Sequence, residues 1–395
     1  MQDFLLISPD LAWPLALALA WIIGEFAHRL IRVPRISSYG IVGFLLASGQ
    51  SGFLPSVDSG AIMLLANIAF GLILFELGCR INLRWLRTNP WLGVTSLVEA
   101  SATFAAVFLV ARWFDMPLIP SLLLSSLAMA TSPAGVLRVV NEQRSSGQVT
   151  ERILHLSAFN CVLAVFTFKV VVGLWVFQST GDILHSLWNS LVVLLVSAAI
   201  GGIFGVAVPS LLKKLGNRGY DATVAFAIAV IILVVLTHTL QFSPVPAALA
   251  FGLMARHRRI ALSQAQQNFG ALGNMLTVLL FVFMAATLEW PMVMAGAGLA
   301  LVLMVVRFTV KTACIVAFAH LSGITSHKGL LTGMALTPLS AFVILLLEQT
   351  RHLGIGLMDQ MAALAAITLM LEIIGPIATQ WALVLAKEVP DTTGT

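Results

Sequence analysis

Charged residues are scarce in this chain. Asp, Glu, Lys and Arg make up 10% of its 395 residues, whereas hydrophobic types make up 59%. A soluble globular protein carries about 25% charged residues, so this chain cannot cover a water-facing surface. The same hydrophobicity excludes an intrinsically disordered chain. The composition therefore predicts an all-α polytopic membrane protein whose surroundings are the lipid bilayer.

Cysteine is also scarce, with three residues, too few for a disulfide framework. The sequence contains no Cys and His cluster with metal-site spacing and no glycine-rich phosphate-binding motif. The net charge of +5 is spread over short loops between apolar runs rather than gathered in one basic patch. We therefore expect no enzyme, no cofactor, no metal and no nucleic-acid partner.

Most of the chain consists of long apolar segments, and we interpret thirteen of them as transmembrane helices. Their expected limits are 10–32, 36–52, 60–79, 90–113, 116–141, 150–178, 183–212, 219–240, 243–256, 266–288, 291–319, 327–347 and 356–386. The ninth is the shortest and contains Pro244 and Pro246. Within the seventh, Gly201 and Gly205 form a GxxxG pattern, which favours close helix packing.

The loops between these segments indicate the orientation of the chain. With the N-terminus outside, seventeen of the 22 Lys and Arg residues lie in or near inside loops, and the outside loops are acidic. This distribution follows the positive-inside rule. It predicts a multi-pass protein of the bacterial-type cytoplasmic (inner) membrane, with the N-terminus outside and the C-terminus inside. The first apolar run is expected to be a span rather than a cleaved signal peptide.

Two segments contain a polar break with proline. Residues 131–135 of the fifth read Thr-Ser-Pro-Ala-Gly, and residues 337–340 of the twelfth read Thr-Pro-Leu-Ser. Proline removes a backbone donor, and hydroxyl side chains can satisfy the freed backbone groups. Each segment is the second in a run of three, and the two runs have opposite orientations. This predicts inverted repeats with two crossing discontinuous helices; the alternative is two ordinary proline kinks.

Four polar groups lie near the centres of these same runs of helices. They are Glu99, Asn160, Arg307 and Glu372. A charge at a helix centre costs at least about 2.5–3.5 kcal/mol on insertion scales, so each charged group needs a partner or a cavity. We interpret the four as one constellation at the membrane midplane, in which Arg307 forms a charge-assisted hydrogen bond with Glu372 or Glu99.

Other ionisable groups have simpler interpretations. Glu25 and Glu76 each precede an arginine by four residues, so both can form ion pairs within one helix. Lys311 lies one turn from Arg307 on the same helical face, where it either faces the core or extends toward the cytoplasm. His155 is expected to be a hydrogen-bonded residue near the membrane interface.

Several short motifs occur in a familiar order. Residues 74–78 read Leu-Phe-Glu-Leu-Gly, residues 130–133 read Ala-Thr-Ser-Pro, and residues 160–161 read Asn-Cys. Together with Arg307 and Lys311, this order resembles the monovalent cation:proton antiporter superfamily, of the sodium/proton exchanger type, over nearly the whole chain. In that family the first motif closes the third helix, the second is an unwound crossing helix, and the third is usually Asn-Asp or Asp-Asp.

The resemblance implies a homodimer in which a six-helix core exchanges Na⁺ or K⁺ for protons by an elevator-like movement. The domains that it implies are dimerisation helices in 1–89 and 219–290, core helices in 90–182 and 291–388, a linker helix in 183–218 and a polar tail in 389–395.

Two residues depart from the family pattern. Cys161 stands where the family has its ion-carrying aspartate, and Ser132 where a second aspartate is often found. A neutral thiol is a poor ligand for Na⁺ or K⁺, which prefer oxygen. Cation:proton antiport remains the leading hypothesis. The alternatives are the same fold transporting an anion or organic acid, and a membrane sensor that does not transport.

A proton-coupled carrier needs an exchangeable carboxylate near the midplane. We expect Glu99 to be that group, with Glu76 as the alternative on the cytoplasmic side. The full set of expected ion- or proton-binding residues is Glu99, Glu76, Thr131, Ser132, Asn160, Cys161 and Ser340. The expected charge-compensating residues are Arg307, Lys311 and Glu372.

Overall fold

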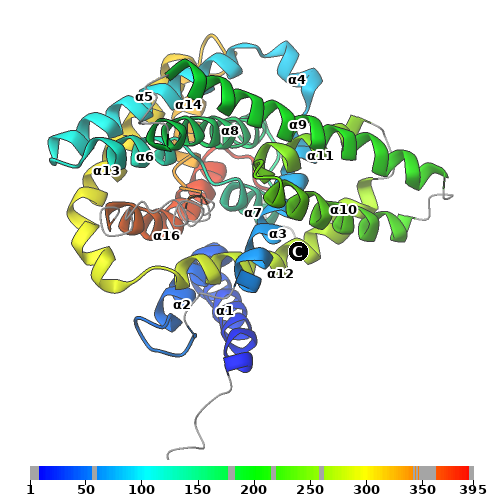
Figure 1. Ribbon diagram of the computed structural model, residues 1–395, viewed down its shortest axis with the longest axis horizontal. Helices are drawn as coiled ribbons and strands as arrows, with labels where there is room; N and C mark the ends of the chain where they lie inside the picture. Colours follow the sequence, from blue (N-terminus) through cyan, green and yellow to red (C-terminus); the bar gives the residue numbers. More distant parts are fainter. Residues whose placement is uncertain are drawn as a thin grey trace, which may run out of the picture.

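The computed structural model describes residues 9–55, 60–176, 183–214, 219–257, 262–340 and 362–390, together with Val343 and Leu346. Within these ranges all regular secondary structure is α-helical (Figure 1). The helices are α1 (Pro9–Ile31), α2 (Arg35–Leu46), α3 (Gly60–Arg80), α4 (Leu83–Thr88), α5 (Trp91–Trp113), α6 (Leu118–Ala128), α7 (Pro133–Gln143), α8 (Gln148–Val176), α9 (Ile183–Lys214), α10 (Gly219–Thr239), α11 (Pro244–His257), α12 (Leu262–Ala286), α13 (Trp290–Ala317), α14 (Ser326–Ala335) and α16 (Ala362–Leu385).

The all-helical, multi-pass fold expected from the sequence is confirmed. Each of the thirteen predicted segments contains a described helix, and nine stretches of the described chain are long and apolar enough to cross a membrane. The proline-containing ninth segment is α11, a 14-residue helix. The sequence did not predict α4, which begins after Asn82 in a loop, where the Asn82 side chain accepts hydrogen bonds from the amides of Arg84 and Trp85.

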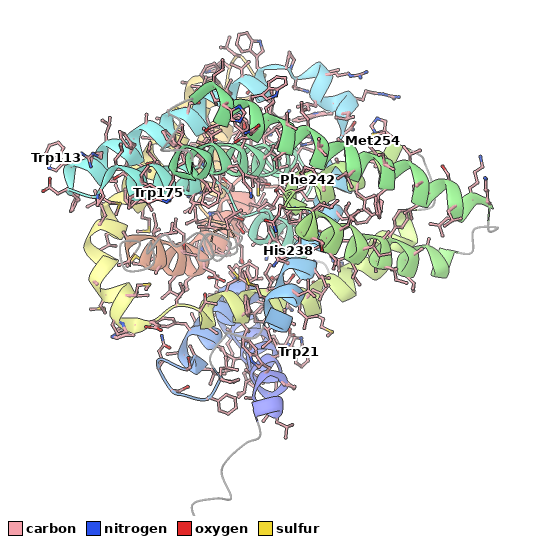
Figure 2. All side chains as sticks on the ribbon, viewed as in Figure 1. Trp21, Trp113, Trp175, His238, Phe242 and Met254 are labelled. Atoms are coloured by element: carbon pink, nitrogen blue, oxygen red, sulfur yellow. The ribbon has the colours of Figure 1, made fainter. Side chains whose placement is uncertain are left out.

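Burial separates inner helices from outer ones. An 18-residue stretch within residues 118–143, which contain α6 and α7, is fully buried inside the protein, whereas the buried share of the corresponding stretch is 17% within residues 184–214 and 22% within residues 11–31. The exposed surface is apolar: Trp113 is 86% exposed and Trp21 is 56% exposed, and both lie at the periphery in Figure 2. Such extended apolar exposure fits contact with lipid rather than water.

Helices α3, α9, α10 and α11 pack around a separate apolar cluster that includes Phe75, Phe226 and Phe251. The GxxxG glycines of α9 allow this packing, because a Cβ atom at Gly201 would lie 1.9 Å from the carbonyl oxygen of Ala247 on α11. The predicted role of this pattern in close helix packing is therefore confirmed.

The other helices surround the two proline-containing segments. Helix α13 packs against α5, α14 and α16, and α8 packs against α5, α6 and α7. Figure 1 shows α10 and α11 on one side of the molecule and α5, α6, α13 and α16 on the other, with α7 between them. Of the candidate spans among the described residues, the one that contains α6 and α7 thus has the largest buried share and lies in the interior.

Candidate functional site

The first predicted break is present. Helix α6 ends at Ala128, the backbone is non-helical through Ser132, and α7 begins at Pro133. Proline is well suited to the first helical position because its missing N–H has no partner there. The Ser132 hydroxyl accepts a hydrogen bond from the backbone N–H of Gly135 (3.0 Å) and so caps α7. Ser132 therefore stabilises the break.

The second break lies directly against the first. Helix α14 ends at Ala335, and residues 337–340 are non-helical. The backbone N–H of Ser132 donates to the carbonyl of Pro338 (3.0 Å), which joins the two breaks. The rest of the twelfth predicted segment lies outside the described residues, apart from Val343 and Leu346. The break on the α14 side is thus confirmed, and its contact with the first break is direct.

Arg307 of α13 holds the two breaks together. Its side chain is 1% exposed. It donates to the carbonyls of Ala128 (2.9 Å) and Ala130 (2.7 Å) at the first break and to those of Thr337 (2.6 Å) and Pro338 (3.4 Å) at the second. Carbonyls at a helix C-terminus lack helical partners, and the planar guanidinium presents five donors to them.

The predicted pairing of Arg307 was therefore wrong. Arg307 does face the core, but within the described residues it forms no ion pair with Glu99 or Glu372. The physical reason is that each break frees several buried carbonyls, and the guanidinium is the group that satisfies them.

The basic partner of Glu99 is Lys311 instead. Glu99 on α5 is fully buried and Lys311 on α13 is 1% exposed. The Lys311 ammonium directly contacts Glu99 Oε1 in a buried salt bridge. It also lies 3.1 Å from the carbonyl oxygen of Met129 and 3.4 Å from Thr131 Oγ1, both at the first break. Of the two arrangements expected for Lys311, the structure has the one that faces the core.

Asn160 of α8 completes this arrangement. Its Nδ2 donates to Glu99 Oε2 (2.8 Å) and to Thr131 Oγ1 (3.3 Å). Its Oδ1 accepts a hydrogen bond from Ser96 Oγ (2.9 Å). We call the group formed by these side chains and Lys311 the Glu99 site. Sequence reasoning missed Ser96, although it precedes Glu99 by three residues and so lies on the same helical face.

The remaining predicted site residues lie elsewhere or play other parts. Cys161 is fully buried within the main apolar cluster. Within the part of the chain that the structure describes, the buried Ser340 hydroxyl has no hydrogen-bond partner. Glu372 on α16 is 3% exposed, and both of its carboxyl oxygens also lack a partner among these residues. Glu76 belongs to a different polar group, at the end of α3.

Glu76 joins α3 to α7. Its carboxylate forms a salt bridge with Arg138 (3.2 Å) and accepts a hydrogen bond from Asn141 Nδ2 (2.9 Å). The i,i+4 partner expected from the sequence, Arg80, is more distant (3.9 Å). Arg138, counted with an inside loop in the sequence, is instead 4% exposed within α7 and also donates to Asn274 of α12 (3.1 Å).

A second ionic group joins α1 and α2 to the end of α7. The expected i,i+4 pair of Glu25 with Arg29 is confirmed at 2.7 Å. Arg35 bridges Glu25 (2.8 Å) and Glu142 (3.0 Å), and His28 lies 2.7 Å from the same Glu142 carboxylate. The contact between Arg35 and Glu142 spans 107 residues of sequence, so local spacing gave no signal for it.

His155 has the role expected from the sequence. Its side chain is fully buried, and its Nε2 accepts a hydrogen bond from the backbone N–H of Asn82 (3.1 Å). Among the described residues no cluster of three or more His, Cys, Asp or Glu side chains could hold a metal ion.

Comparison with known proteins agrees with this architecture. The family model of the transmembrane sodium/hydrogen exchanger matches residues 15–385. A structure of the sodium/proton antiporter MjNhaP1 from Methanocaldococcus jannaschii at pH 8 is similar, with a TM-score of 0.66, 16% identity and 96% of each chain covered. An electron-microscopy structure of the same antiporter has a TM-score of 0.65 and 18% identity, with 95% of this chain and 94% of that chain covered. These two likenesses show the fold, and the family match spans nearly the whole length, so the chain belongs to the sodium/hydrogen exchanger family.

Proposed function

We propose that this protein is a secondary active transporter that exchanges Na⁺ or K⁺ for protons, with Glu99 as the exchangeable carboxylate. The observation that carries the proposal is the Glu99 site itself. A fully buried carboxylate lies against the Lys311 ammonium, and the same ammonium also contacts two oxygen atoms of an unwound helix. Buried ionisable groups within a membrane protein are costly and typically functional.

The Lys311 ammonium marks where a cation would bind. It contacts three oxygens, from Glu99, Met129 and Thr131. Na⁺ and K⁺ also prefer oxygen ligands, so a monovalent cation would take the same position. Two positive charges cannot share one buried carboxylate without strong repulsion. Cation entry therefore requires the ammonium to withdraw or to release its proton, and this competition is the basis of the proposed exchange.

The site also offers an account of the missing aspartate. Cys161 is buried in apolar surroundings, whereas the preceding residue, Asn160, holds Glu99 in place through its amide. In our proposal the carboxylate of Glu99, supplied by α5, replaces the one that α8 supplies elsewhere in the family. Thr131 and Asn160 would orient this carboxylate, and Ser132 and Arg307 would maintain the breaks.

We further propose an elevator-like movement. The moving core helices would be α5, α6, α7, α8, α13, α14 and α16, which carry both breaks and the Glu99 site. The static scaffold helices would be α1, α2, α3, α10, α11 and α12, with α9 as the linker and with a second copy of the chain completing a homodimer. Where α7 meets the scaffold, the contacts include the salt bridges of Glu76 with Arg138 and of Arg35 with Glu142. Such polar contacts can break and reform in water as the core moves.

The orientation of the chain enters this proposal as well. The arginines at the ends of α1, α3 and α7 favour the cytoplasmic side for these ends. The N-terminus would then be outside and the C-terminus inside a bacterial-type inner membrane. The two ionic groups that join α7 to the scaffold would lie on the cytoplasmic side of the Glu99 site.

The test is proton flux in proteoliposomes that carry an imposed pH gradient and a pH-sensitive fluorophore. We expect dequenching on addition of Na⁺ or K⁺, with Li⁺ as a third cation in the scan. Flux that depends on an added anion or organic acid but not on any cation would replace this proposal by transport of that solute. Absence of flux with every solute, from a well-folded protein, would favour a sensor.

A further inference from the structure

Glu372 is a buried carboxyl group that lies outside the Glu99 site. It lies on α16, 3% exposed, and neither of its oxygens has a hydrogen-bond partner among the described residues. It faces α2, because a Cβ atom at Gly40 would lie 3.4 Å from its Cγ and 3.5 Å from its Cδ. Gly40 of α2 thus lies directly against the carboxyl group.

Two further polar groups near Glu372 also lack partners. Thr368 precedes it by four residues and so lies on the same face of α16. The Thr368 hydroxyl is buried and unpaired, as is that of Ser340. Helix α16 runs antiparallel to the second break, since Thr379 donates to the carbonyl of Ala335 (2.9 Å) and Gly375 lies against Pro338. Ser340 therefore lies toward the Glu372 end of α16.

The charged groups on the helices that pack against α16 are already committed to other partners. On α13, Arg307 donates to carbonyls and Lys311 contacts Glu99. On α7, Arg138 pairs with Glu76. The remaining titratable groups on these helices have other partners or surroundings. Glu142 of α7 pairs with Arg35 of α2 and with His28, and Tyr39 of α2 packs against Gly24. Cys314 of α13 is half-buried, His327 at the start of α14 is exposed, and Lys328 bonds to Gln148.

No described positive charge is therefore available to Glu372. An ionised carboxylate buried without a hydrogen bond or a counter-charge is strongly disfavoured, and such a group becomes neutral by binding a proton. We propose that Glu372 is a second proton-binding site, which holds a proton while α16 rests on α2 and releases it to water when the core helices move away from α2.

The release step rests on the elevator movement of the proposed function. In the present arrangement α2 covers Glu372, and Ser37 of α2 donates to the carbonyl of Ile373 (2.8 Å), which fixes the register of the two helices. A displacement of α16 along α2 would break this hydrogen bond and remove Gly40 from above the carboxyl group. Water could then solvate the carboxylate, so the O–H bond would break only in the displaced state.

The protonation itself can be tested without transport. Infrared spectra of the purified full-length protein in lipid at neutral pH should contain the C=O stretch of a protonated carboxylic acid. We expect this band to be lost in Glu372→Gln and in Glu372→Met. Methionine has no side-chain amide, so the second variant separates loss of the carboxyl group from any effect of the glutamine amide. It should persist in Glu289→Gln, which alters an exposed carboxylate. An undiminished band in both Glu372 variants would overturn the proposal.

The release step is tested by the pH dependence of flux in proteoliposomes. Glu372→Gln should lose part of the pH dependence of flux that the unmodified protein and Glu289→Gln show, because a glutamine at this position cannot release a proton. Identical pH profiles for Glu372→Gln and the unmodified protein would overturn proton release. If the unmodified protein shows no flux, the proposed transport function fails, while the infrared result still decides whether Glu372 holds a proton.

Discussion

Replacing Arg307 by alanine removes the group that holds the two breaks together. The guanidinium makes three hydrogen bonds of 2.9 Å or shorter to carbonyls, and a fourth of 3.4 Å. Hydrogen bonds that involve a charged group contribute about 1.5–3 kcal/mol each. Because burying the guanidinium has its own cost, we take the lower value for the three short bonds, which gives a loss of about 4.5 kcal/mol.

This loss is large compared with a total stability of about 5–15 kcal/mol. The entropy of unfolding is about 2.1 cal/mol/K per residue, or roughly 0.8 kcal/mol/K for 395 residues. Arg307→Ala should therefore lower the melting temperature by about 5 °C. The assay is thermal unfolding of the purified protein in one detergent, followed by intrinsic fluorescence.

Two control variants sharpen this prediction. Arg112→Ala removes an exposed arginine that bonds to one carbonyl, that of Met116 (2.6 Å), and should change stability by no more than about 0.5 kcal/mol. Arg307→Lys keeps the charge, but its compact ammonium cannot reach the carbonyls of both breaks. Its melting temperature should therefore lie between that of Arg307→Ala and that of the unmodified protein. If Arg307→Ala melts together with Arg112→Ala, the assigned role of Arg307 is refuted.

Three further substitutions test other parts of the structure. Gly201→Leu should separate α9 from α11 and lower the melting temperature, because a Cβ atom at Gly201 would lie 1.9 Å from the Ala247 carbonyl oxygen. The control is Gly298→Leu, which should have little effect because a Cβ atom at Gly298 meets open space. Glu388→Ala should cost about 0.5–2 kcal/mol in thermal unfolding, because the Glu388 carboxylate accepts bonds from the first residues of α8 at 2.8 Å; an unchanged melting curve would contradict this. Cys161→Ala should leave cation-dependent proton flux nearly unchanged, because the thiol is buried within the main apolar cluster, and loss of flux in this variant would show that the thiol itself is needed.

The breaks could be predicted from the sequence because their cause is local. Pro133 and Pro338 interrupt apolar segments beside hydroxyl residues, and a helix cannot continue normally through such a sequence in lipid. The depth of Glu99 and Asn160 in their segments likewise predicted that both lie at the centre, and they contact each other directly.

The choice of partner for Glu99 could not be predicted in the same way. Arg307 and Lys311 lie one turn apart on one face of α13, so the sequence shows that both can face the core. Whether Arg307 or Lys311 contacts the Glu99 carboxylate depends on the depth at which the free carbonyls of the two breaks lie beside α13. That depth is set by how the helices pack against one another, which the sequence of α13 does not show. The three short carbonyl contacts of Arg307 leave Lys311 for Glu99.

Contacts between distant segments were also beyond sequence reasoning. The sequence places Glu388 at the end of the last core segment, before a polar tail. In the structure its carboxylate caps α8 across 239 residues of sequence. Arg138 was counted with an inside loop because it is basic, yet it is buried against Glu76. Charge and spacing place such residues at a membrane interface, but they do not reveal which helix lies opposite.

The central claim is that Glu99 is the exchangeable carboxylate, and the most direct measurement of it is proton flux through Glu99→Gln. The glutamine keeps the shape of the side chain and can still bond to Asn160, but it cannot ionise and cannot attract a cation. At matched protein density in proteoliposomes, we predict that Glu99→Gln abolishes the cation-dependent flux of the unmodified protein, while Glu289→Gln retains it. Full flux through Glu99→Gln would contradict the account and would place the exchangeable proton on another carboxylate, with Glu76 the next candidate.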